Sequence, residues 1–180
     1  MFKNYIVLIL SFLSMLLAKW EPIKSLDPVP AKINLLSSNI SNSTIKFEID
    51  GFELLDVNTE NGMQSIAKVD AGASIMELGS PDLQKLSASI IIPDDKKMNF
   101  RILETEFVEF NNILIAPSKG NLTRESIPSE IEYEWNDTYT QNRFYPGRLA
   151  NLNTPYIVRD NRGITVNVFP FQYNPISKIL

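Results

Sequence analysis

The 180-residue chain contains neither cysteine nor histidine. These absences exclude disulfide bonds, thiolate and imidazole catalysis, and metal sites built on Cys or His ligands. The formal net charge of −4, without a basic stripe along the chain, argues against a nucleic-acid partner. A hydrophobic content of 44% is typical of a globular fold rather than a disordered chain. Carboxylate-pair and Ser–Lys catalysis remain open.

Residues 1–18 have the pattern of a secretory signal peptide. Lys3 precedes the apolar run Tyr5–Leu17, and the small residue Ala18 offers a cleavage point. The run falls short of the roughly 20 residues that span a bilayer, which disfavours a transmembrane anchor. A lipoprotein is excluded because no cysteine is present to carry the lipid. The expected organisation is a signal peptide (1–18), an extended proline-rich lead-in (19–32) and one domain (33–180).

Short strands separated by Gly, Pro and Asn turns are expected along the domain. Apolar residues alternate with charged ones from Thr44 to Asp50, which is typical of a half-buried strand, and the run continues past Gly51. The Asn- and Gly-containing segment 58–62 predicts a turn. The β-branched run Ile90–Ile92 predicts a strand, and the apolar residues of Met98–Ile115 predict two further strands or one long bent strand.

The second half of the chain continues the β pattern. "SPDLQKL" (80–86) accommodates one or two helical turns, and no longer helical period follows Ala18. Residues 130–160 are rich in Tyr, Asn, Asp and Pro and predict a long ordered excursion. Alternation returns in "RGITVNVFPFQYNP" (162–175). Together these patterns predict an all-β fold, an antiparallel β-sandwich of two packed sheets with long ordered loops.

Outside one loop, few polar residues suggest a catalytic, metal-binding or modification site. Glu104 and Glu106 lie two apart and, with Glu109, Asp94 and Asp95, could be imagined as a calcium or glycosidase site. A solvated strand face is the simpler interpretation, and no D-x-D-x-D-G calcium loop is present. Exposed loop positions are likewise the simpler interpretation of the four N-x-S/T sequons, at Asn39, Asn42, Asn121 and Asn136.

The loop in "NILIAPSKGNLTRESIPSE" (112–130) is the sharper candidate. A short apolar strand stops at Pro117, and a polar loop that contains Lys119, Gly120 and a single arginine, Arg124, runs to Pro128. The two prolines fix backbone torsions at its ends. Chemistry alone favours a solvated loop arginine, and the residues taken by themselves predict a secreted, non-catalytic β domain.

Several segments, in their order and spacing, resemble the N-terminal propeptide of gingipain-family cysteine endopeptidases, nearest to Arg-specific gingipain precursors. They are "IAPSKG", "FYPG", "RD-x-RG" and "QYNP". The similarity runs from Ile33 to Leu180 and is densest after Phe107. "LGSPDLQKL" is similar to the family's "GTP-x-LP" segment but departs from it at Asp82 and Gln84.

The resemblance implies a non-catalytic β-sandwich that inhibits, and helps to fold, a caspase-like catalytic domain that follows it. The chain would then stop short of that domain, which would be its partner in cis. The resemblance also implies that Arg124 occupies the specificity pocket of the protease, flanked by Thr123 and Glu125, on a loop that includes Lys119 and Gly120. An acidic partner in that pocket would meet the planar guanidinium through two parallel hydrogen bonds. No catalytic residue, metal or cofactor is expected within the chain itself.

Two alternative functions stay open. One is the pro-region of a sortase-like peptidase of type IX secretion. The other is a surface adhesin or carbohydrate-binding sandwich, which predicts exposed aromatic platforms at Trp135, Tyr139 and Phe144. The leader and the resemblance together predict a secreted protein, in the periplasm during transit and then extracellular or on the cell surface. No nucleic-acid partner and no stable membrane insertion after signal cleavage are expected.

Overall fold

A computed structural model describes residues 18–180, so the predicted leader lies outside the described residues except for Ala18. The strands are β1 (Lys19–Pro22), β2 (Lys32–Ser38), β3 (Ser43–Glu48), β4 (Gly51–Thr59), β5 (Gly62–Lys68), β6 (Ala73–Ser74), β7 (Gln84–Ile91), β8 (Ala150–Leu152), β9 (Tyr156–Val158) and β10 (Asn161–Val168). Two short 3-10 helices, η1 (Pro128–Glu130) and η2 (Asp137–Thr140), complete the described elements. Over this part of the chain, no helix is long and apolar enough to cross a membrane.

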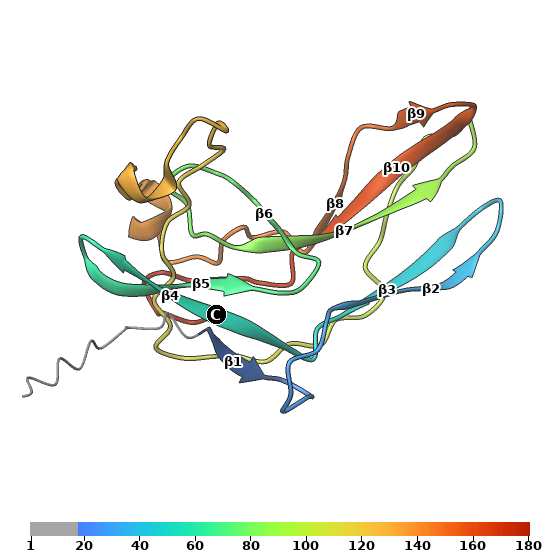
Figure 1. The fold of residues 1–180 in the computed structure, drawn as a ribbon. Coiled ribbons are helices and arrows are strands. Elements are labelled where there is room, and N and C mark those ends of the chain that lie inside the picture. Colours follow the sequence, from blue (N-terminus) through green and yellow to red (C-terminus); the bar gives the residue numbers. More distant parts are fainter. Residues whose placement is uncertain (1–17) are drawn as a thin grey trace, which may run out of the picture.

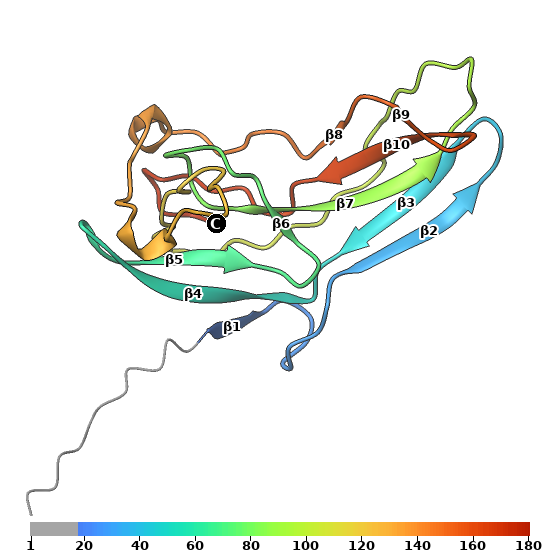
Figure 2. The same cartoon turned by 45° about the horizontal axis from the view of Figure 1, so that its top comes forward.

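The strands form two layers and a separate hairpin (Figures 1 and 2). One sheet has the order β1-β4-β5, and the facing sheet has the order β6-β7-β10-β8, with β9 also paired to β10. Strands β2 and β3 pair only with each other and diverge from the β9–β10 end of the molecule in Figure 1. All of these strand pairs are antiparallel, which confirms the predicted all-β antiparallel fold.

The core lies between the two layers. Phe52 of β4 is 1% exposed, and its ring packs edge-on against Phe110 and Phe171 at centroid distances of 5.0 and 5.2 Å. Leu54 is also buried, whereas Glu53 between the two is more exposed, as expected for alternate faces of a strand. Buried leucines of the opposite layer close the core, among them Leu86 of β7.

Several predicted elements are confirmed. The alternating segment 44–50 overlaps β3, and the predicted turn at 58–62 includes the connection between β4 and β5. Gly62 has φ = 95°, a backbone conformation that favours glycine. The strand predicted at Ile90–Ile92 is the end of the longer β7. Strand β1 lies inside the predicted lead-in 19–32 and pairs with β4.

The strands predicted over Met98–Ile115 are wrong. In the described structure this stretch has no regular strand and makes only isolated bridges, such as Ser65 with Ile115. Residues 99–109 are all exposed, and Phe107 is 82% exposed. Alternation favours an extended chain but does not provide a neighbour with free N–H and C=O groups. Within the described chain residues 99–109 make no backbone-to-backbone hydrogen bond, and the segment reaches the edge strand β5 only at its end, in the isolated bridge of Ile115 with Ser65.

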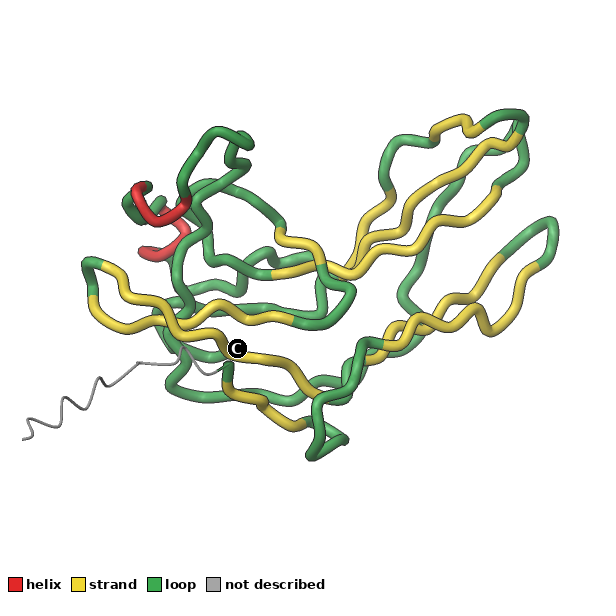
Figure 3. Tube along the Cα trace, viewed as in Figure 1, coloured by secondary structure: helices red, strands yellow, loops and turns green. Residues whose placement is uncertain are grey.

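The helical turns considered for "SPDLQKL" are also absent. Figure 3 shows helix only at one end of the molecule, where η1 and η2 lie. Segment 80–82 is extended because it bonds to a neighbouring chain segment: the Asp82 N–H donates to the Ala116 carbonyl at 2.8 Å, and the Ser118 N–H donates to the Ser80 carbonyl at 2.7 Å. Tertiary pairing therefore overrides a weak local helix signal.

Residues 19–180 are expected to fold on their own, because the two layers bury a core without disulfide or metal. Circular dichroism should show a β-rich monomer, and neither a chelator nor a reductant should change its unfolding temperature. A helix-dominated spectrum, or loss of structure on addition of the chelator, would contradict this expectation.

Candidate functional site

The candidate loop is rooted in the segment Leu114–Ser118, which we call the strap and whose last four residues are buried. Ile115 and Ala116 are fully buried. On one side the strap meets Ser65 of β5, whose N–H donates to the Leu114 carbonyl at 2.7 Å and whose carbonyl accepts from the Ala116 N–H at 2.9 Å. On the other side it bonds to segment 80–82. The strap thus links β5 to the segment that leads into β7, and it fixes the point from which the loop leaves the core.

Two tyrosine hydroxyls complete the hydrogen bonding of the strap. The Tyr139 hydroxyl donates to the Ile115 carbonyl at 2.9 Å. The Ile115 N–H donates to the Tyr173 hydroxyl at 3.4 Å, and that hydroxyl donates to the Ile113 carbonyl at 3.1 Å. Burial raises the pKa of both Tyr139 and Tyr173, so both hydroxyls keep the protons they donate. Neither backbone group of Ile115 is left without a partner.

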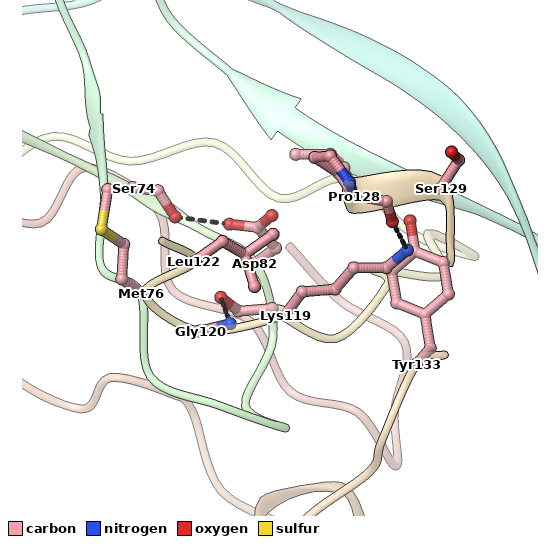
Figure 4. Close-up of a pocket in the computed structure, with 11 residues that line it drawn as sticks. Ser74, Met76, Asp82, Lys119, Gly120, Leu122, Pro128, Ser129 and Tyr133 are labelled. Atoms are coloured by element: carbon pink, nitrogen blue, oxygen red, sulfur yellow. Dashed lines mark hydrogen bonds between the residues drawn. The ribbon is translucent and has the colours of Figure 1, made fainter. Parts of the chain in front are cut away.

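The base of the loop is closed by Lys119. Its ammonium donates to the Pro128 carbonyl at 2.7 Å and lies 4.1 Å from the centre of the Tyr133 ring (Figure 4). Gly120 has φ = 74°, and a Cβ there would lie 3.2 Å from the Leu78 Cβ, so the turn requires glycine. Lys119 and Gly120 therefore shape the loop rather than project from it.

The tip of the loop is a β-turn that carries Arg124. The Ser126 N–H donates to the Thr123 carbonyl at 3.1 Å, and the two side-chain hydroxyls bond at 2.9 Å. Arg124 and Glu125 are the central residues of this turn, and both are exposed. Within residues 18–180 the Arg124 guanidinium has no salt-bridge partner. The turn holds a free guanidinium at its apex.

A pocket of about 440 Å³ lies at the loop base. Asp82, Lys119, Leu122 and Tyr133 are among its lining residues (Figure 4). The Ser74 hydroxyl donates to the Asp82 carboxylate at 2.7 Å. Burial raises the pKa of the Asp82 carboxyl; the Ser74 hydrogen bond and the charge of Lys68 oppose the rise only in part. Asp82 is thus a partly buried carboxylate beneath the loop.

The five loop residues predicted from the sequence lie together, but in two groups. Lys119 and Gly120 form the base, while Thr123, Arg124 and Glu125 form the tip. The prediction missed bracing residues: Ser126 at the tip, Tyr133 at the base, and Tyr139 and Tyr173 around the strap. Only Ser126 left a local signal, its three-residue spacing from Thr123.

The other candidates do not assemble into sites. Glu106 accepts a hydrogen bond from Lys24, and no group of three acidic residues within 18–180 lies close enough to hold a metal ion. Tyr139 packs against the core and holds the strap, so it offers no exposed platform. Asn136 differs from the expected exposed sequon, because its amide donates to Leu78 and Ser80 and its oxygen caps η2.

The fold and loop together define a class of domain: an all-β sandwich with an exposed arginine at the apex of one loop. The family model Propeptide_C25 matches residues 25–180. The chain therefore belongs to the C25 propeptide family, the propeptides of gingipain-type cysteine peptidases, as the resemblance predicted.

Its relatives include gingipains of Porphyromonas gingivalis. The chain is 37% identical to gingipain R2 and 38% identical to gingipain R1, each over 149 residues. These alignments cover 83% and 82% of this chain but only 20% and 15% of the relatives. The chain thus spans at most a fifth of the length of these proteins.

Two solved structures share the fold. A complex of Porphyromonas gingivalis RgpB pro- and mature domains matches with a TM-score of 0.79 at 36% identity, covering 82% of this chain and 77% of that chain. A gingipain K structure from the same species, described in terms of zymogenic latency, matches with a TM-score of 0.71 and covers 89% of this chain and 91% of that chain. At 17% identity, the second match supports the fold alone.

Substitution of Asp82 tests the energetics of the loop base. In the folded chain the pKa of Asp82 lies above its ordinary value of 3.8. Protonated Asp82 therefore favours the folded state at low pH, and this contribution to stability is lost as the pH rises through the folded-state pKa. Asp82→Asn keeps an oxygen for Ser74 but carries no buried charge. Urea titrations should show the variant more stable than wild type near neutral pH, with the difference shrinking in acid. A less stable variant at neutral pH would show that the ionised carboxylate stabilises the fold.

Proposed function

We propose that this chain is the inhibitory pro-segment of a secreted gingipain-type cysteine endopeptidase, and that it keeps the following protease domain inactive by placing Arg124 in the specificity pocket of that domain. The observation that carries the proposal is the exposed guanidinium at the apex of a loop held at its root, base and tip. The RgpB relative, solved as a complex of its pro- and mature domains, supports pairing of this chain with a mature protease domain.

The loop carries two cationic side chains, Lys119 and Arg124, and their contacts favour Arg124 as the one that enters the pocket. The Lys119 ammonium is already engaged by the Pro128 carbonyl and the Tyr133 ring. Arg124 has no such partner within residues 18–180 and can offer its whole guanidinium to an acidic pocket. A planar guanidinium matches a carboxylate through two parallel hydrogen bonds, a geometry that an ammonium does not reproduce.

Preorganisation of the loop supports inhibition rather than loose binding. An unrestrained loop loses about 0.5–1.5 kcal/mol for each side chain that it orders on binding. Here the strap, Lys119 and the Thr123–Ser126 turn already restrict the backbone before docking. Thr123 and Glu125 would flank Arg124 in the active-site cleft.

The remaining functional proposals follow from the same assignment. The chain supplies no Cys or His, so the catalytic residues belong to the protease domain, and the full precursor is a cysteine endopeptidase. A pro-segment with its own core can also act as a folding aid for that domain. With the predicted leader, the route is export through the periplasm to the cell surface or the medium.

Replacing Arg124 tests the proposal most simply. Arg124→Ala would leave an acidic pocket unpaired in the complex, and breaking a desolvated charge pair of this kind costs on the order of 2–5 kcal/mol. At about 1.4 kcal/mol per tenfold, the inhibition constant against the mature protease should rise by roughly thirtyfold or more. Arg124→Lys should recover only part of the loss, because the lysine ammonium restores the charge but not the two parallel N–H donors of the guanidinium.

Arg143→Ala is the matched control, since Arg143 is also an exposed arginine but lies outside the loop. Arg148 is a second control with a structural role of its own, because its guanidinium lies 4.8 Å from the centre of the Phe169 ring. Both controls should change the inhibition constant much less than Arg124→Ala does. If Arg124→Ala inhibits as well as wild type while a control variant does not, the loop assignment is wrong.

A further inference from the structure

Residues 99–109, which lie between β7 and the strap, combine an unpaired backbone with exposed apolar side chains. Every residue of this stretch is exposed, and within the described chain none makes a backbone-to-backbone hydrogen bond. Its large apolar side chains are Phe100, Ile102, Leu103, Phe107 and Val108, of which Phe107 is 82% exposed. A row of free N–H and C=O groups with apolar side chains beside it is a template for another strand.

An antiparallel ladder has already begun at one end of this stretch. The Phe110 N–H donates to the Leu180 carbonyl at 2.8 Å, and the Leu180 N–H donates to the Phe110 carbonyl at 3.0 Å. Asn111 and Ile179 form an antiparallel bridge beside this pair. Leu180, the end marked C in Figure 1, is buried. A chain that continues from Leu180 in the same direction therefore meets Glu109 first and then runs back along the stretch.

We propose that the residues that follow Leu180 in the precursor, positions 181–191, form a strand that pairs antiparallel with residues 99–109. From the proposed function this inference takes only that a protease domain follows the pro-segment in the same chain. The paired stretch leads directly into the strap. The connection to the protease domain is thus anchored beside the segment from which the Arg124 loop is suspended.

The pair that already exists fixes the register of the added strand. Each step back from Phe110 meets one step forward from Leu180, so position 182 faces Val108 and position 183 faces Phe107. Phe110 and Leu180 exchange both of their backbone hydrogen bonds. Hydrogen-bonded and non-hydrogen-bonded pairs alternate along an antiparallel ladder. Val108 is therefore in the next hydrogen-bonded pair, and Phe107 is in a non-hydrogen-bonded pair.

A disulfide tests this register in the full-length precursor, with the catalytic thiol of its protease domain removed to prevent autolysis. Phe107→Cys is combined with a cysteine at position 183. Residues of a non-hydrogen-bonded pair lie about 4.5 Å apart at Cα, a separation that a disulfide spans. In the matched control the second cysteine is at position 182, whose side chain points to the opposite face. After mild oxidation, mass spectrometry should find the cross-linked peptide at least about tenfold more abundant with position 183 than with the control.

Hydrogen exchange of the unmutated stretch in the same precursor provides the second measurement. The N–H groups of Val108, Glu106 and Glu104 lie on the edge that the added strand occupies, whereas those of Phe107 and Thr105 point away from it. Residue-resolved mass spectrometry should show the first set exchanging about tenfold or more slowly than the second. This alternation distinguishes a paired strand from general coverage by the protease domain.

Two results would overturn the inference. One is equal exchange at both sets of amides without the cross-link, and the other is a cross-link that forms equally well with position 182. The proposed function is judged separately, by the dependence of inhibition on Arg124. Inhibition that needs Arg124 in a precursor with neither signal would leave that function standing without the added strand. Both signals, together with inhibition that does not need Arg124, would support the strand and contradict the role of the loop.

Discussion

Burial of the strap is the constraint on which the rest of the site depends. Ile115 and Ala116 are fully buried, so their backbone groups must find partners inside the protein. An unsatisfied buried group costs about 1–3 kcal/mol, and here Ser65, segment 80–82 and the tyrosine hydroxyls supply the partners. Satisfying these groups forces the two sheets and the strap into one arrangement, and the loop leaves the core at a point that this arrangement fixes.

The sequence predicted most accurately the strands and turns that local interactions determine. Alternation located β3 and the later strand β10, and the Asn–Gly turn located the connection between β4 and β5. It failed over Met98–Ile115, where an alternating pattern forms no regular strand. In the described chain residues 99–109 make no backbone-to-backbone hydrogen bond, and only the strap at the end of this stretch bonds to the edge strand β5. Extended conformation is a local property that a pattern can indicate, whereas membership of a sheet depends on contacts with distant segments.

In the candidate site, too, local features could be predicted from the sequence, whereas features that depend on distant contacts could not. A proline-framed loop with a single Arg124 was visible in the sequence, and the resemblance to gingipain propeptides is the source of the role proposed for that arginine. The roles of Lys119 and Gly120 were not visible, because they depend on the Pro128 carbonyl, the Tyr133 ring and the Leu78 side chain. Residues that brace a loop through distant contacts leave little signal in one sequence, whereas the residue that the loop presents can be recognised by its type.

We propose Arg124 as the group that this propeptide inserts into the specificity pocket of its protease. A crystal structure of residues 19–180 bound to the mature protease domain would test it most directly. We expect both terminal nitrogens of Arg124 to lie within hydrogen-bond distance of one carboxylate in the pocket, with the strap and the loop base unchanged. A complex in which the pocket is empty or holds another side chain, with Arg124 in solvent, would contradict it.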